Sequence, residues 1–133
     1  MYIDYLTYHE VDVRNTKKLS VEQGNLTEGK LSKLFTQIEK GKITNLEAGN
    51  QEEAYSMVVF LEGTNSRIGI VDEEEETGYV YDNLQDDESD IGIAGYDFPQ
   101  WSVCSDPTIL IEILKEFITT GEMLSTVSWR EEW

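Results

Sequence analysis

The side chains best suited to chemistry in this sequence are carboxylates, and they are densest in two clusters. We name these the 72–76 cluster and the 86–90 cluster. Their acidic members are Asp72, Glu73, Glu74, Glu75 and Glu76 in the first, and Asp86, Asp87, Glu88 and Asp90 in the second. From residue 68 to residue 114 the chain holds 13 Asp and Glu and no Lys or Arg. This stretch predicts one strongly negative flank on the folded protein.

Carboxylates grouped in this way resemble a phosphate backbone, so they would suit a surface that covers the cationic cleft of a nucleic-acid-directed enzyme. Such a surface also speeds the capture of a basic partner. The alternative is that both clusters are solvated loops that serve only solubility.

Acids of the 86–90 cluster stand at alternate positions, as the ligands of a calcium-binding loop do. We therefore compare this segment with such a loop. A calcium loop of the EF-hand type needs glycine at its sixth position and a bidentate glutamate at its twelfth. Counted from Asp86, those positions hold Ile91 and Asp97. We therefore expect no metal site here.

A catalytic set is not apparent in the sequence. Nucleophilic catalysis needs a nucleophile beside a base, and the only histidine, His9, stands in no recognisable motif. The only cysteine, Cys104, has the surroundings of a small core residue, and Gly92-Ile93-Ala94-Gly95 lacks the lysine of a phosphate-binding loop. We expect a protein that is not an enzyme and uses no cofactor.

The net charge limits the kinds of molecule that this protein can bind. The 133 residues include 27 Asp and Glu against 10 Lys and Arg, a formal charge of −17. Direct binding to nucleic acid or to an anionic membrane is disfavoured by this balance, whereas a basic protein is attracted. With no signal peptide or long apolar run in the sequence, we expect one domain over residues 1–133 that acts in the cytoplasm.

Hydrophobic periodicity predicts two helices. The first begins near Asn25 and Glu28, has an apolar stripe from Leu31 to Ile38 and stops at Gly41. The second begins at Asp106-Pro107 and ends at Gly121.

Strands are expected around and between these helices, at residues 1–13, 43–46, 55–61, 67–71, 78–81 and 124–129. Residues 91–96 and 101–104 could add one or two more, with Phe98-Pro99 limiting regular pairing between them. The order predicts an α+β fold in which the two helices pack on a mainly antiparallel sheet.

Aromatic residues offer contact area for a partner. Trp101 and Trp129 are expected to be buried or half-buried, because each stands in an alternating apolar segment. Trp133 ends the chain in a polar tail, and it is our candidate for a partly exposed anchor at an interface.

The last part of the chain carries a pattern that resembles a known family. Its elements are Phe117, Thr120, Gly121, Val127 and Trp129, in the spacing F-x-x-T-G-x-x-x-x-x-V-x-W. The pattern is similar to the C-terminal signature of the first-numbered immunity-protein family of bacterial polymorphic toxin systems, although that family usually has proline where Leu124 stands. We expect Phe117 and Trp129 to pack together, with Gly121 allowing the turn between them.

This resemblance implies a protein that binds and inhibits a cognate toxin domain, such as a nucleic-acid deaminase or nuclease. Both acidic clusters and Trp133 would then face the toxin. The alternative is a general acidic interaction or adaptor domain with no toxin partner.

Overall fold

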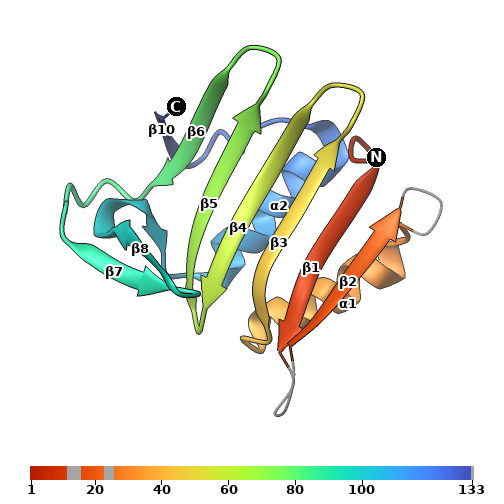
Figure 1. Cartoon of the computed structure of the whole chain (residues 1–133), viewed down its shortest axis with the longest axis horizontal. Coiled ribbons are helices and arrows are strands. Elements are labelled where there is room, and N and C mark those ends of the chain that lie inside the picture. The colour runs from red at the N-terminus through yellow and green to blue at the C-terminus, as the bar shows by residue number, and fades with distance from the viewer. Residues whose placement is uncertain (12–15, 23–25, 133) are drawn as a thin grey trace.

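The computed structural model describes residues 1–11, 16–22 and 26–132, and for 16–22 the backbone alone. Within these residues, eight strands form one antiparallel sheet (Figure 1). Its spatial order is β10 (Ser128–Glu131), β6 (Thr77–Asp82), β5 (Asn65–Asp72), β4 (Tyr55–Glu62), β3 (Ile43–Asn50), β1 (Tyr5–Val11) and β2 (Thr16–Glu22), and β9 (Val103–Cys104) pairs with β5.

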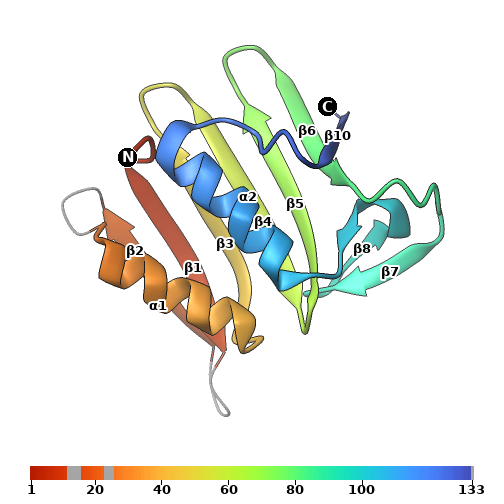
Figure 2. The same cartoon turned by 180° about the vertical axis from the view of Figure 1, so that it is seen from behind.

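Both helices, α1 (Glu28–Glu39) and α2 (Pro107–Thr120), cover the same face of the sheet (Figure 2). The fold is therefore α+β, as the sequence predicts. The helix ends follow local chemistry, since Thr27 accepts from the backbone N–H of Lys30 at the start of α1 and Asp106 accepts from Thr108 at the start of α2. No helix in these described ranges is long and apolar enough to cross a membrane.

The core lies between the sheet and the helices. Alternate residues of neighbouring strands point to this side and are fully buried, among them Met57 paired with Ile70 and Val59 paired with Ile68. From α2, Leu114 and Phe117 pack against them. The period of two in the strands and the apolar stripe of the helix bury the same layer from both sides.

The strands β7 (Asp90–Ile93) and β8 (Tyr96–Pro99) form a second, two-stranded sheet. It lies beside the face of the main sheet that the helices do not cover. The expectation that Phe98-Pro99 would limit pairing is wrong. Pro99 occupies the end of a two-stranded ladder, where its missing N–H costs little. Phe98 packs on Phe60 of β4, with ring centroids 5.6 Å apart, and so anchors the hairpin.

One omission and two further expectations need correction. The strand β2 was not anticipated, although its backbone pairs with β1 along seven residues. Trp101 lies in a short 3-10 helix at Gln100–Ser102 (η2) and not in a strand. The last strand begins at Ser128, not at residue 124. Of the two residues expected near the start of the first helix, Glu28 is the first residue of α1, and Asn25 lies outside the described residues.

Candidate functional site

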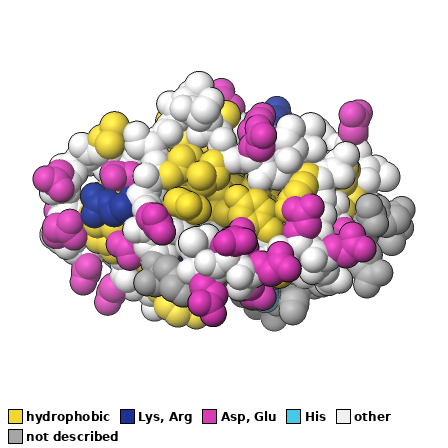
Figure 3. Space-filling model, turned by 90° about the horizontal axis from the view of Figure 1, so that it is seen from above, with side chains coloured by type: hydrophobic (Ala, Val, Ile, Leu, Met, Phe, Trp, Pro, Cys, Tyr) yellow, Lys and Arg dark blue, Asp and Glu magenta, His cyan; other side chains and the backbone are white. Residues whose placement is uncertain are grey.

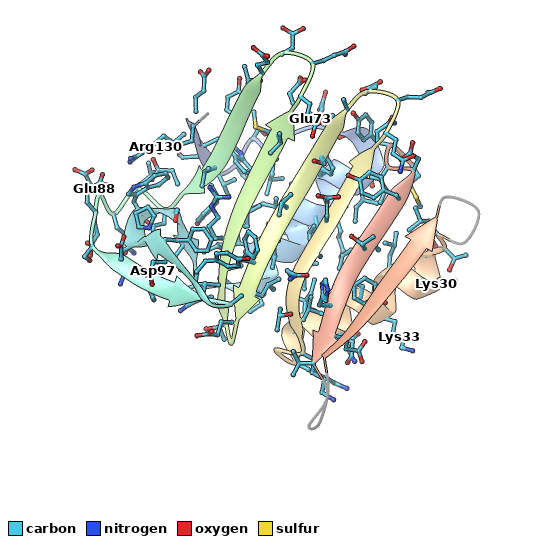
Figure 4. All side chains as sticks on the ribbon, viewed as in Figure 1. Lys30, Lys33, Glu73, Glu88, Asp97 and Arg130 are labelled. Atoms are coloured by element: carbon cyan, nitrogen blue, oxygen red, sulfur yellow. The ribbon has the colours of Figure 1, made fainter. Side chains whose placement is uncertain are left out.

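The two acidic clusters lie at opposite ends of β6. The 72–76 cluster forms the turn that leads from β5 into this strand, and the 86–90 cluster follows it. A strand of this length spans about 20 Å. Figure 4 shows the separation, with Glu73 beside the β5–β6 turn and Glu88 at the lateral edge of the molecule. The structure thus does not bring the two clusters together.

The 86–90 cluster is partly neutralised by Arg130 of β10. Its guanidinium lies 3.4 Å from Asp82 and 3.6 Å from Glu88, and stacks 3.6 Å from the ring centre of Trp101. Asp87 accepts hydrogen bonds from the backbone N–H and hydroxyl of Ser89, which lower the pKa of its carboxyl group. Asp87 and Glu88 are thus each engaged by a neighbouring group, and all four acids of this cluster are exposed to solvent.

The 72–76 cluster borders a cleft of about 780 Å³ on the helix side of the sheet. The cleft lies where the β3–β4 turn, the β5–β6 turn and the C-terminus of α2 meet. It is lined by Tyr2, Glu53, Tyr55, Asp72, Glu74, Glu75, Thr77, Tyr79, Thr120 and Gly121. Lys and Arg are absent from this lining. Figure 3 looks onto this end, where side chains of the hydrophobic colour class gather in the middle and carboxylates lie around them.

Tyr2 forms part of the cleft wall and is held from several directions. Its hydroxyl donates to Glu53 Oε2 at 2.7 Å, and its backbone N–H donates to the Ile118 carbonyl at 2.8 Å. Its ring meets those of Tyr55 and Phe117 edge-on, with centroids 6.1 and 5.8 Å away. Burial, and then the Glu53 carboxylate, raise the pKa of the Tyr2 hydroxyl above its ordinary value.

Hydrogen bonds from two backbone N–H groups hold the acidic turn beside this wall. The N–H of Glu73 donates to the Ala54 carbonyl at 3.0 Å, which joins the β5–β6 turn to the β3–β4 turn. The N–H of Glu75 donates to Asp72 Oδ1 at 3.1 Å. Burial, and then the Asp72 charge, raise the pKa of Tyr55. Glu74 and Glu75 are left exposed at the rim.

The family-signature residues divide between the cleft and the core. Thr120 and Gly121 line the cleft, and Phe117 is fully buried below it. Trp129 is half-buried as predicted, but its ring pairs with Tyr81, not with Phe117. Its indole N–H donates to the Leu124 carbonyl at 3.1 Å. The expected Phe117–Trp129 ring pair is therefore wrong, because each ring has other aromatic partners. Val127 packs at the edge of the core.

Most of the Lys and Arg residues precede β3 in the sequence. Seven of the ten Lys and Arg precede residue 43, at positions 14, 17, 18, 30, 33, 40 and 42. Figure 4 shows Lys30 and Lys33 on α1, beyond the sheet edge farthest from Glu88. Among the described residues, the ion pairs recorded are those of Arg130, so no carboxylate of the cleft has a cation partner there.

Sequence reasoning missed several cleft residues. Tyr2, Glu53, Tyr55 and Tyr79 carry no motif, and Tyr2 meets Glu53 only because the chain returns after 51 residues. The turn chemistry around Asn50, whose side chain accepts from the Glu53 N–H, was a weak local signal for this turn. Trp133 lies outside the described residues, so its expected role as an anchor stays a prediction.

The other reactive groups lie away from the cleft. Cys104 is fully buried, as predicted, and burial raises the pKa of its thiol. His9 is half-buried on β1 and its ring hydrogen-bonds to Asn45. In the part of the chain that the structure describes, no three His, Cys, Asp or Glu side chains are grouped to hold a metal ion.

No protein-family model matches this sequence, and no curated protein matches it. The fold is similar to a solved structure described as a hypothetical protein from Neisseria gonorrhoeae. The TM-score is 0.65, and the match covers 92% of this chain and 91% of that chain. At 13% sequence identity, this similarity shows the fold alone.

Proposed function

We propose that this chain is an immunity protein that binds a cognate bacterial toxin domain and inhibits it by covering a basic active-site face. The observation that carries the proposal is the cleft beside the 72–76 cluster. Its four carboxylates, on Glu53, Asp72, Glu74 and Glu75, have no cation partner among the described residues. Uncompensated negative charge around a concave surface suits a positively charged protein.

The charge distribution supports the same partner. Lys30 and Lys33 lie on α1, whereas Glu73 and Glu88 lie before and after β6, on the other side of β3 and β4 (Figure 4). A protein with such a field orients itself as it approaches a basic surface, and steering of this kind raises association rates by about 10- to 1,000-fold at low salt. Speed matters for an inhibitor that must reach a toxin before the toxin reaches its substrate.

The chemistry of the target follows from that charge. A toxin domain that acts on nucleic acid, such as a deaminase or nuclease, carries a cationic active-site face for the phosphate backbone. Carboxylates held on short turns of a rigid sheet can occupy such a face without being substrates. The resemblance at Phe117, Thr120, Gly121, Val127 and Trp129 supports the same proposal, under which the chain acts in the cytoplasm as a stoichiometric inhibitor and not as an enzyme.

The acids of the 86–90 cluster and Trp133 stand apart in this proposal. The ion pair of Glu88 with Arg130 reduces the charge that the cluster offers to a partner. We assign that cluster to the long-range field and the cleft to the docking surface, with Trp133 kept as a predicted anchor.

The direct test uses the toxin domain that the proposal expects to be encoded beside this gene. The two proteins are co-expressed, the complex is purified, and the activity of the toxin on nucleic acid is titrated with the inhibitor. We expect a one-to-one complex and complete inhibition at equivalence. Weak binding to many unrelated basic proteins, lost as salt rises, would instead identify a general acidic adaptor.

A charge-reversal pair tests the surface itself. Glu74→Lys with Glu75→Lys should slow association with the toxin by about tenfold or more at low salt. The matched control, Glu39→Lys with Glu112→Lys, changes net charge equally at exposed helix positions away from the cleft. Equal slowing by both pairs would show that only net charge matters and that the cleft is not the interface.

A further inference from the structure

The interior of the cleft is aromatic as well as acidic. Tyr2, Tyr55 and Tyr79 line it, and all three side chains are half-buried. An aromatic face attracts a cation through its quadrupole, and a planar guanidinium can stack on such a face, whereas an ammonium acts as a compact point charge. Rings and carboxylates around one cavity therefore favour a cation, and among cationic side chains they favour arginine.

The C-terminus of α2 adds negative potential at the same place. Thr120 and Gly121, which end the helix, belong to the lining of the cleft. The last carbonyls of a helix carry the equivalent of about half a negative charge. The last turn of α2 contains no basic residue that would neutralise it. A cation in the cleft gains from this end of the helix.

The carboxylates of Glu53 and Asp72 are held in place with acceptor capacity to spare. Glu53 uses Oε2 for the Tyr2 hydroxyl, and Asp72 uses Oδ1 for the N–H of Glu75. For the second oxygen of each, no hydrogen bond to another described residue is recorded. A guanidinium has five N–H donors in a planar fork, which can use such oxygens together.

We propose that this cleft binds an arginine side chain that the protein partner inserts, with the guanidinium against the tyrosine rings and hydrogen-bonded to Glu53 and Asp72. The inference rests on the proposed function, since it places this arginine on the toxin domain. The cleft has a volume of about 780 Å³, which is within the range of small-ligand sites. It therefore has room for the arginine side chain and for part of the toxin loop that carries it.

The first experiment uses three capped tripeptides as probes, Gly-Arg-Gly, Gly-Lys-Gly and the citrulline analogue of the first. Citrulline keeps the shape of arginine and lacks the charge. Binding is followed by NMR on the full chain. We expect saturable shifts at Gly121 and the cleft tyrosines with the arginine peptide, at a dissociation constant on the order of 1 mM. The lysine peptide should bind more weakly and the citrulline peptide not at all.

Replacing each carboxylate by the amide of the same shape tests whether Glu53 and Asp72 bind the arginine. Glu53→Gln keeps an acceptor for the Tyr2 hydroxyl, and Asp72→Asn keeps the acceptor of its turn, so the pair removes charge alone. It should weaken binding of the arginine peptide about tenfold, a loss of about 1.4 kcal/mol. The control, Glu39→Gln with Glu112→Gln, removes as much charge elsewhere and should change affinity less than about twofold. Equal weakening in both pairs overturns the proposal.

The same two variants are then measured against the purified toxin domain. Loss of toxin affinity in Glu53→Gln/Asp72→Asn, with the control unchanged, is the expected result. If toxin binds the unmodified protein and both variants equally and no peptide binds, the arginine site is overturned while the immunity function stands. If the arginine peptide binds and the toxin does not, the immunity function fails, and the preference of the cleft for arginine survives.

Discussion

The ring of Tyr2 lies directly against Gly121, so closely that a Cβ atom at position 121 would come within 2.6 Å of Tyr2 Cδ1. Gly121 also has a φ of +77°, a conformation that side chains rarely adopt. One glycine therefore ends α2 and makes room for the wall of the cleft. The signature glycine has a packing role that its sequence position alone does not reveal.

Gly121→Ala should lower the free energy of unfolding by about 2 to 4 kcal/mol, since it adds both backbone strain and a clash. Tyr2 cannot easily move away, because its backbone and hydroxyl are both hydrogen-bonded. The control is Gly95→Ala, where φ is +86° and no atom lies within 4 Å of the new Cβ. We expect a loss of about 1 kcal/mol there, from strain alone. Urea unfolding measures the free energy of unfolding of both variants. Equal losses would show that the contact with Tyr2 adds nothing to the cost of Gly121→Ala.

Trp129→Ala should destabilise the fold by about 2 to 3 kcal/mol, less than a fully buried tryptophan would, because this ring is only half-buried. The change removes the edge contact with Tyr81, at 6.4 Å between centroids, and the hydrogen bond to Leu124. Trp129→Phe keeps a ring and loses the N–H, so it should cost about 1 kcal/mol. The midpoint of denaturant-induced unfolding measures the loss of stability in each variant. A loss near zero for Trp129→Ala would contradict this packing of the indole ring.

Alkaline pH should destabilise the protein through Tyr81. Burial, and then the Cys104 thiol, raise the pKa of Tyr81 from 10.0 to about 12. The unfolded chain therefore releases this proton first, so the contribution of Tyr81 to stability is intact below pH 10.0 and is lost as pH rises to about 12.

The measurement is the free energy of unfolding against pH for the unmodified protein and for Tyr81→Phe. Other groups titrate in the same window, but the difference between the two proteins isolates this residue. We expect the difference to change steadily through that window. A difference that stays constant with pH would show that Tyr81 ionises equally in both states.

Replacing Arg130 by methionine should cost about 1 kcal/mol. The change removes the stacking over Trp101 and the ion pairs with Asp82 and Glu88, each worth up to about 1 kcal/mol when partly exposed. Adding salt should shrink the part of this loss that comes from the ion pairs. Thermal unfolding at two salt concentrations measures both effects. A variant as stable as the original protein would show that the contacts of Arg130 contribute nothing to stability.

The sequence by itself determined the local features of this protein. The boundaries of α2 follow from Asp106, Pro107 and Gly121, since a cap, a fixed φ and a left-handed stop act within one turn of the chain. The alternating apolar residues of β4 and β5 were likewise sufficient to predict strands. Strand β2 escaped this reasoning, because an edge strand with two adjacent lysines has a weak hydrophobic pattern.

Only the tertiary structure decided which of these features meet. It separated the two acidic clusters by the length of β6, and it gave Glu88 a cation while leaving Asp72 without one among the described residues. It also joined Tyr2 to Glu53 and Gly121 across long stretches of sequence. Periodicity and capping act over a few residues, whereas a cleft is formed by contacts between distant segments, which depend on strand order and register.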